Sequence, residues 1–177
     1  MDENKQLWKK CVEFHGHECP GLTIGYKAAL YATELLDLAF SKDEQVVCIA
    51  ENDACGVDAI QVLLGCSVGK GNLLFHMTGK QAWSFYERES GRSVRLLLKE
   101  PAEKMERAEI FAYYQQREGE ELFAAMEPRL QLPEQARIFD SYICEECKEK
   151  TGANWIRIQD GRKLCVDCCK KYDRFRV

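Results

Sequence analysis

The chain has no apolar run that approaches the ~18 residues needed to cross a bilayer as a helix. Its first residues, Met1 to Lys5, are polar and lack the apolar segment of a secretory signal peptide. A strong charge of one sign is also absent, because 25 Lys and Arg stand against 29 Asp and Glu. A basic surface for nucleic acid is therefore not indicated. We expect a cytoplasmic protein with neither a membrane nor a nucleic-acid partner.

Cysteine, in contrast, is abundant, with 10 residues in a chain of 177. Cysteines that persist without an export signal point to a reducing compartment, where thiols bind metals or do redox chemistry. Four of them form two pairs, Cys144-x2-Cys147 and Cys165-x2-Cys168, separated by 17 residues. Four thiolates delivered by two such turns can surround one zinc ion tetrahedrally. The spacing therefore predicts a structural zinc site in the tail of the chain.

Two disulfides or two redox pairs are the alternatives for this pattern. A redox CxxC normally opens a helix after a buried strand, and two such pairs lie close together here. The order of predicted elements also favours zinc. A strand leads to the turn at Cys144–Cys147, a hairpin turns at Asp160-Gly161, and Cys165 and Cys168 open a last helix over Val166–Phe175. That order is the treble-clef arrangement, so residues 137–177 are predicted to form a treble-clef zinc finger.

The first 130 residues predict a separate core domain of the α+β class. Apolar spacing indicates helices at 3–14, 20–38, 57–64 and 102–126, the last with a break near Gly119. Strands are indicated at 46–50 and 73–77, with a hairpin formed by 82–87 and 93–98. This mixture favours helices packed on a mainly antiparallel sheet. Pro128 and Pro133 then interrupt any continuation and set the domain boundary.

A second constellation lies in the core domain, in two loops that each precede a predicted helix. His15, His17 and Cys19 fall within five residues, and Cys55 follows Asp53 after a predicted strand. The two thiols would stand at helix starts, where free N–H groups should lower their pKa. Imidazole and thiolate together suit Zn, Ni or Fe. His17, Cys19 and Cys55 are therefore predicted to hold a transition metal with one position open, as in catalytic zinc sites.

Other interpretations of these residues stay open. His15 or His17 can be a surface or capping residue, and Cys55 can be a buried small apolar residue. Cys19 and Cys55 can also be a redox pair without metal. His15, Asp53 and Lys70 are candidates for cofactor or substrate contacts. Lys70 lies in the glycine-rich segment Cys66–Asn72, which lacks the Walker spacing and can equally be a plain turn.

Several stretches of the chain strongly resemble the FmdE family, named after the E component of formylmethanofuran dehydrogenase. They are Phe14–Tyr26, Glu51–Gln61, Gly65–Leu73, Gly79–Ala82 and the four-cysteine tail. The resemblance implies an α+β core that is often followed by a treble-clef finger, a homodimer, and a cleft built from the His/Cys loops. It does not imply formate chemistry, since nothing in the chain resembles a molybdopterin or iron–sulfur pattern.

These observations lead to three functional hypotheses. The first is a metal-dependent FmdE-like protein that is either an enzyme of unknown substrate or an accessory of an oxidoreductase, with a small-molecule or protein partner. The second is a zinc-finger adaptor that catalyses nothing. The third is a metal-storage or metal-delivery protein. A coordination position left open in a cleft would favour the first, and a core site closed by four protein ligands would favour the second.

Overall fold

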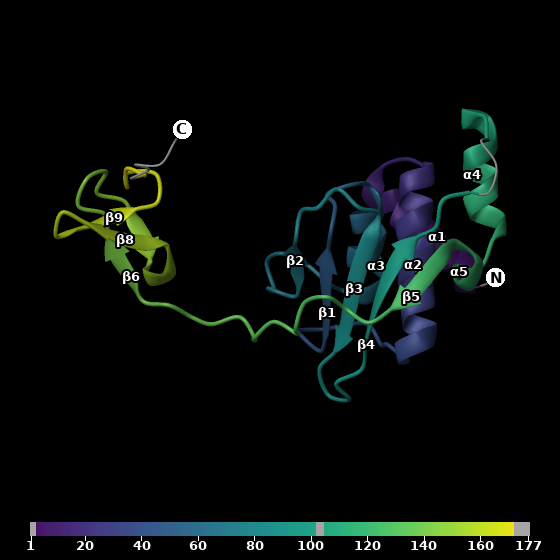
Figure 1. Cartoon of the computed structure of the whole chain (residues 1–177), viewed down its shortest axis with the longest axis horizontal. Coiled ribbons are helices and arrows are strands. Elements are labelled where there is room, and N and C mark those ends of the chain that lie inside the picture. The colour runs from purple at the N-terminus through teal and green to yellow at the C-terminus, as the bar shows by residue number, and fades with distance from the viewer. Residues whose placement is uncertain (1–2, 102–104, 172–177) are drawn as a thin grey trace. The chain divides into compact units, whose positions relative to one another are not determined.

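In the computed structural model, which describes residues 3–101 and 105–171, the chain forms two units, Met1–Ala136 and Arg137–Val177. The first, called the core unit, packs helices on a five-stranded sheet. The second, called the tail unit, contains two short hairpins (Figure 1). No helix in the described ranges is long and apolar enough to cross a membrane.

The sheet of the core unit has the strand order β2-β1-β3-β4-β5. Its strands are β1 (Val46–Ala50), β2 (Leu73–Phe75), β3 (Ala82–Glu87), β4 (Ser93–Leu98) and β5 (Phe123–Met126). Only the β1–β2 pair is parallel, and the pairs along β1, β3, β4 and β5 are antiparallel. The predicted α+β class with a mainly antiparallel sheet is thus confirmed.

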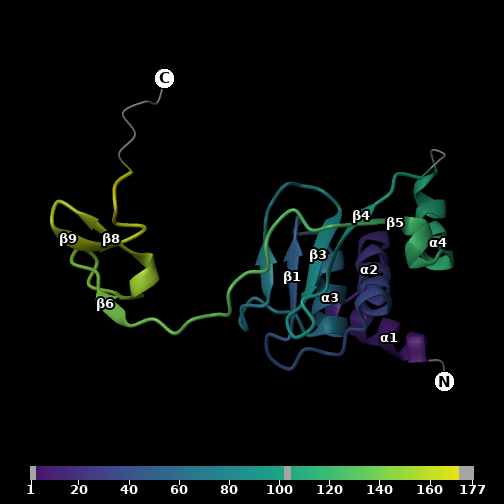
Figure 2. The same cartoon turned by 60° about the horizontal axis from the view of Figure 1, so that its bottom comes forward.

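One face of this sheet is covered by helices. They are α1 (Glu3–His15), α2 (Pro20–Leu36), α3 (Gly56–Leu64), α4 (Arg107–Gln116) and the short α5 (Gly119–Leu122). Figure 2 shows α1, α2 and α3 lying together on the same side of the strands. The main core forms between them, where buried residues of α2 and α3 meet Trp83 and Phe85 of β3. Burying side chains of this size is the dominant favourable term in folding.

The other face is crossed by residues 127–136, the segment that follows β5 (Figure 1). The Tyr86 hydroxyl donates a hydrogen bond to the Leu130 carbonyl at 2.7 Å. Arg88 donates one to the Pro133 carbonyl at 2.8 Å, and the N–H of Ala136 donates one to Glu44 at 3.0 Å. This segment therefore belongs to the core unit, six residues beyond the boundary expected at residue 130.

The helix predicted for residues 102–126 is only partly formed. Residues 102–104 lie outside the described residues, and the rest divides into α4, α5 and β5. Phe123 is buried and pairs with Leu98, so Phe123–Met126 completes the edge of the sheet. Tertiary pairing with β4 overrides the helix propensity of a short Ala-rich segment.

Two glycines allow α2 and α3 to touch backbone to backbone. A Cβ placed on Gly25 would lie 2.0 Å from the carbonyl oxygen of Gly56 and 2.3 Å from its Cα. Only glycine fits at such a crossing, because any larger residue at position 25 would overlap the backbone of Gly56. Because α2 begins beside Cys19 and α3 beside Cys55, this crossing also sets how near the two thiols lie.

The tail unit is built from two antiparallel hairpins. One pairs β6 (Ser141–Ile143) with β7 (Lys150–Gly152), and the other pairs β8 (Ile156–Gln159) with β9 (Arg162–Cys165), with the 3-10 turn η1 (Ala153–Trp155) between them. The second hairpin turns at Asp160-Gly161, where both residues have positive φ angles of 53° and 76°. This Asp-Gly turn matches the prediction.

The helix predicted for 166–175 is not formed in its described part. Cys168 and Cys169 each donate a backbone hydrogen bond to the Cys165 carbonyl, which makes one turn. The backbone of Lys170 is then paired with the Gln159 side chain, through hydrogen bonds of 2.9 Å at both its N–H and its carbonyl. Residues 166–171 therefore form turns, and residues 172–175 lie outside the described residues.

Candidate metal centres

The first candidate centre is in the core unit, at the junction of α1 and α2. His15 ends α1, Gly16 follows with a φ angle of 94°, and Pro20 occupies the first turn of α2. Cys19 is the N-cap of α2, and its sulfur accepts a hydrogen bond from the Leu22 N–H at 3.3 Å. The predicted placement of Cys19 at a helix start is thus observed.

His15 is fixed by hydrogen bonds that reach across to α3. Its Nδ1 lies 2.7 Å from an oxygen of Asp58, in the first turn of α3. The other oxygen of Asp58 accepts a hydrogen bond from Gln61 Nε2 at 3.1 Å. The His15 side chain is only 11% exposed. The opposite ring nitrogen, Nε2, lies 3.7 Å from the Cys19 sulfur.

His15, His17 and Cys19 form a group that can hold a metal ion. Their candidate ligand atoms all lie within 4.8 Å of one another. The two imidazole rings are 4.5 Å apart between centroids. Two ligands on one ion at ~2.0–2.3 Å stand roughly 3.3–3.8 Å apart when the geometry is tetrahedral. The 3.7 Å between His15 and Cys19 falls in that range without any rearrangement.

Cys55 lies next to this group without being part of it. It is the N-cap of α3, but its side chain makes no capping hydrogen bond. Burial, followed by a hydrogen bond with Cys19, raises the pKa of Cys55. The expectation that the helix start would lower this pKa is therefore wrong, because desolvation disfavours the thiolate more than the helix end favours it. A Cβ on Gly21 would lie 3.6 Å from the Cys55 sulfur and 4.0 Å from the Cys19 sulfur.

A pocket of about 360 Å³ opens beside these residues. His15, Cys55, Asp53 and Asp58 line one part of it. Apolar side chains complete the wall, namely Val57, Val68, Leu73 and Phe75. Pockets that combine an apolar lining with a few convergent polar groups are typical of small-molecule sites.

Lys70, the third candidate contact residue, lies elsewhere. Its Nζ donates a hydrogen bond to the Ser41 carbonyl at 2.8 Å and stands 5.8 Å from the centre of the Phe40 ring. It lines a second hollow of about 350 Å³ together with Phe14 and Phe40. Within the glycine-rich segment, Asn72 accepts from the Ser67 N–H and donates to the Val46 carbonyl. The segment thus ties strand and turn together, as expected of a plain turn.

A buried ion pair that was not predicted from the sequence adjoins the loop that carries Asp53 and Cys55. Arg95 is fully buried and binds both carboxylate oxygens of Glu51, at 2.6 and 3.1 Å. Thr78 donates a further hydrogen bond to Glu51 at 2.9 Å. The hydrogen bond from Arg95 holds the pKa of Glu51 below its ordinary value. A lone Arg inside the apolar strand β4 was the available signal, since buried charges need partners.

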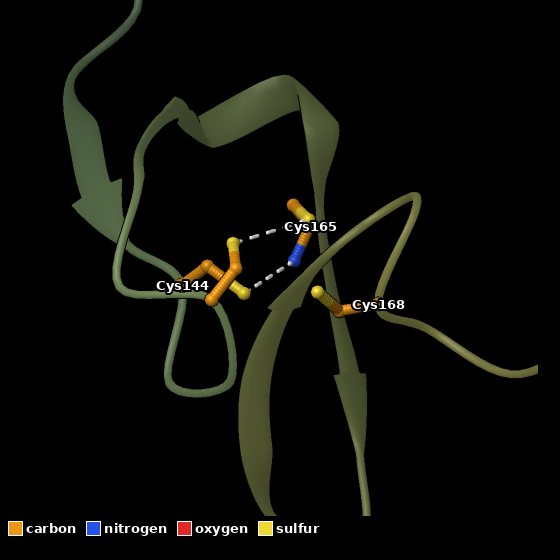
Figure 3. Close-up of side chains that lie close together, drawn as sticks. Cys144, Cys165 and Cys168 are labelled. Atoms are coloured by element: carbon orange, nitrogen blue, oxygen red, sulfur yellow. Dashed lines mark hydrogen bonds between the residues drawn. The ribbon is translucent and has the colours of Figure 1, made fainter.

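The second candidate centre is the four-cysteine group of the tail unit. Its sulfurs, from Cys144, Cys147, Cys165 and Cys168, all lie within 4.8 Å of one another. The sulfurs of Cys147 and Cys165 are 3.9 Å apart, close to the spacing of two thiolates on one ion. Figure 3 shows the side chains of Cys144, Cys165 and Cys168 converging on a common centre. In the described residues all of the cysteines are free thiols, so the two-disulfide alternative is not observed.

The thiols of this group strongly affect one another. The backbone N–H of Cys165, which donates to the Cys144 sulfur at 3.3 Å, lowers the pKa of Cys144 to about 6. The hydrogen bond with Cys165 is the main cause that raises the pKa of Cys168 to about 12. Thiolates this close repel one another, so a divalent cation is what allows all four to ionise together. The donor set therefore fits a metal ion.

Comparisons with known proteins add three findings. A family model described as "FmdE, Molybdenum formylmethanofuran dehydrogenase operon" matches residues 14–140. A "Probable S-adenosyl-L-methionine-binding protein" of Archaeoglobus fulgidus is 29% identical over an alignment 199 positions long, which covers 94% of this chain and 53% of that protein. The chain thus spans about half the length of that curated relative.

The third finding is a structural match. The crystal structure of a tungsten formylmethanofuran dehydrogenase FmdE-like protein from Syntrophus aciditrophicus superposes with a TM-score of 0.67 at 24% identity. The match covers 93% of this chain and 91% of that one. At this identity the likeness shows the fold.

Proposed function

The chain belongs to the FmdE family, and from that premise we propose a cytoplasmic metal-binding protein with two unlike metal sites. The core site uses His15, His17 and Cys19, and it faces a pocket for a small molecule. The tail site uses four cysteines to hold a structural zinc ion. The single observation that carries the core site is the 3.7 Å separation of His15 Nε2 and the Cys19 sulfur, with His17 in the same group.

The core ligand set differs from the one expected from the sequence, which joined His17 and Cys19 with Cys55. His15 takes the place of Cys55 in the three-residue group. Cys55 remains a candidate fourth ligand, because its thiol already contacts Cys19. It also lines the pocket, so a ligand molecule that enters there would meet the same side of the site.

The types of ligand atom limit which metals the core site would bind. Imidazole and thiolate suit Zn, Ni or Fe, whereas Mg and Ca prefer oxygen ligands. A metal held by His15, His17 and Cys19 would supply Lewis-acid activation of a water or substrate. The residues of this chain supply the rest: Asp53 and Asp58 present carboxylates to the pocket, and Val57, Leu73 and Phe75 form an apolar part of its wall.

Metal stoichiometry tests the core site. Full-length protein, loaded with Zn²⁺ and desalted, should contain about two metal ions per chain by elemental analysis, one for each candidate centre. Cys19→Ser should reduce this to about one, and Cys55→Ser should show whether the fourth thiol takes part. His76→Gln is the matched control, because His76 is exposed and is the only His outside the cluster. A wild-type value of one under metal-replete conditions would refute the core site.

S-adenosyl-L-methionine is a candidate ligand for the pocket. The Archaeoglobus fulgidus relative is named for S-adenosyl-L-methionine, whose sulfonium carries a positive charge. Two carboxylates in the pocket, Asp53 and Asp58, favour a ligand with such a charge. Calorimetric titration of the wild-type chain with this compound, against Asp53→Asn, would show binding that weakens in the variant. A flat titration would exclude this ligand and leave the metal proposal intact.

The adaptor function is the second candidate, and one observation favours it. The tail unit exposes large apolar side chains, including Ile143 (55%), Trp155 (57%) and Ile158 (67%). Exposed apolar groups in a small unit are typical of protein contacts. The metal-dependent function and the adaptor function predict different core sites: the first leaves a coordination position on the metal open, and the second does not. Azide should change the absorption spectrum of the Co²⁺-loaded core if a coordination position is open, and should leave it unchanged if four protein ligands close the site.

A further inference from the structure

We propose that Asp58 and Gln61 are positioning residues that hold His15 as the Nδ1–H tautomer, so that its Nε2 faces the core metal; this inference rests on the proposed metal function. No role was assigned to either residue from the sequence alone. Both lie on α3, about one helical turn apart, and Asp58 is 43 residues from the histidine that it reaches.

The hydrogen-bond geometry determines the tautomer. An ionised carboxylate only accepts hydrogen bonds, so the 2.7 Å contact between Asp58 and His15 Nδ1 requires the proton on Nδ1. With the proton on Nδ1, a neutral ring has its lone pair on Nε2, the atom that lies 3.7 Å from the Cys19 sulfur. A lone pair at that position is what a metal requires of imidazole.

Gln61 extends this hydrogen-bond network to three residues, because it contacts Asp58, which contacts His15. Its Nε2 donates to the second carboxylate oxygen of Asp58 at 3.1 Å, so each oxygen of that carboxylate has one partner. Asp58 also stands in the first turn of α3, where the helix end favours a negative charge. A charge that serves only the helix end would need no contact with His15. The short contact to a side chain on another helix is what indicates the positioning role.

The partial burial of His15 and Asp58 makes the contact between them rigid. The side chain of His15 is 11% exposed and that of Asp58 is 34% exposed, so water competes weakly at the histidine and more at the carboxylate. The ring cannot rotate without breaking the contact to Asp58. The ring is therefore held ready for a metal before one arrives, which lowers the entropy that binding must overcome.

The first experiment measures the tautomer without any core metal. Long-range ¹H–¹⁵N NMR spectra of the full chain, with the tail loaded and the core free of metal, should report His15 as the Nδ1–H form. In Asp58→Ala that preference should be lost. Asp53→Asn is the matched control, since it removes a carboxylate from the same pocket and leaves the His15 contact in place. An Nε2–H tautomer in the wild type would overturn the proposal.

The second experiment measures affinity, by competition between the core site and a chelating dye for Co²⁺. Asp58→Ala should weaken binding by about 10–100-fold, as loss of an outer-shell partner of a metal-binding histidine usually does. Asp58→Asn and Gln61→Leu should weaken it less, because Asn can still accept from Nδ1 and Asp58 remains in the Leu variant. Melting temperatures of the metal-free variants separate this effect from a loss of folding, and Asp58→Asn serves if Asp58→Ala does not fold.

The outcomes distinguish this inference from the proposed function. If the wild type binds one metal only, the proposed core metal site is refuted. The NMR spectra of the metal-free core still show whether Asp58 sets the tautomer of His15. If the core site binds and Asp58→Ala binds equally well, the positioning role alone is refuted. If Asp58→Ala instead slows alkylation of Cys19 while metal affinity stays constant, Asp58 orients His15 as a base for a reactive thiol, and the ligand role of His15 is overturned.

Discussion

Replacing Gly25 by Ala tests whether the crossing of α2 and α3 positions the core metal ligands. The added methyl group would stand 2.0 Å from the Gly56 carbonyl oxygen, whereas ordinary van der Waals contact begins at 3.4 Å. The two helices must therefore separate locally by at least about 1.4 Å, the difference between these two distances. Both atoms in the clash belong to backbone or Cβ, so no flexible side chain can absorb it.

The free-energy change has two opposing parts. Ala in the interior of α2 gains about 1 kcal/mol over Gly in helix propensity. Overpacking a tight contact costs typically 1–3 kcal/mol and more when backbone must move, so we expect the upper end here. The net loss of unfolding free energy is then about 2 kcal/mol or more. For a domain of this size that lowers the melting temperature by on the order of 5–10 °C.

Thermal unfolding and metal analysis of the same preparations measure both effects. Gly25→Ala should melt at a lower temperature and bind the core metal more weakly, because α2 begins at Cys19 and α3 carries Asp58, which holds His15. The tail metal should be retained. Gly69→Ala is the control, since a Cβ there meets no atom within 4 Å. A Gly25→Ala protein with wild-type stability and a full core site would refute the argument from close approach.

Three further predictions follow from other parts of the molecule. Glu51→Gln leaves the buried Arg95 charge without its partner and should lower the unfolding free energy by about 3–5 kcal/mol at pH 7. The folded-state pKa of Glu51 lies below its ordinary 4.5, so the difference in unfolding free energy between wild type and variant should be full above pH 4.5 and should shrink as the pH falls. Denaturant titrations at several pH values can measure this difference. Cys144→Ser should unfold residues 137–177 and leave the core unit folded; amide protection of the tail that survives thorough chelation would contradict a structural zinc. The homodimer implied by the family resemblance predicts a sedimentation mass twice the 20.4 kDa of one chain, and a single-chain mass at micromolar concentration would reject it.

Parts of the fold that depend on residues close together in the sequence can be predicted from it. Both strands of the hairpin formed by β3 and β4 are predicted with the residues that the structure shows, because two short runs rich in apolar residues flank a Gly-containing turn. Cys19 is placed correctly at the start of α2, since Pro20 marks a helix opening. Residues 123–126 are predicted as helix, because their pairing with β4 depends on a strand far away in the chain.

The core site shows the same division between local and distant signals. Proximity in sequence is enough to bring His15, His17 and Cys19 together. The contact between His15 and Asp58 joins α1 to α3, and no spacing rule connects residues 43 apart. The pKa of Cys55 is predicted in the wrong direction because its burial depends on packing that a helix-end rule does not include.

The tail helix is wrongly predicted for a similar reason. The treble-clef order of elements, from which this helix is predicted, carries no information about a hydrogen-bond partner elsewhere in the chain. The side chain of Gln159, at the end of β8, pairs with both backbone groups of Lys170 and so replaces the hydrogen bonds that a helix would make there.

The order in which the sheet is completed has a consequence for synthesis of the chain. The last strand of the core sheet, β5, ends at Met126, and the segment fastened by Tyr86 and Arg88 ends at Ala136. The four tail cysteines all follow that point. Domains generally fold as units, N-terminal first, as the chain leaves the ribosome. The core unit can therefore bury its own thiols, Cys11, Cys48 and Cys66, before the four tail cysteines emerge, so that cysteines from the two units have little opportunity to mispair or to share one ion.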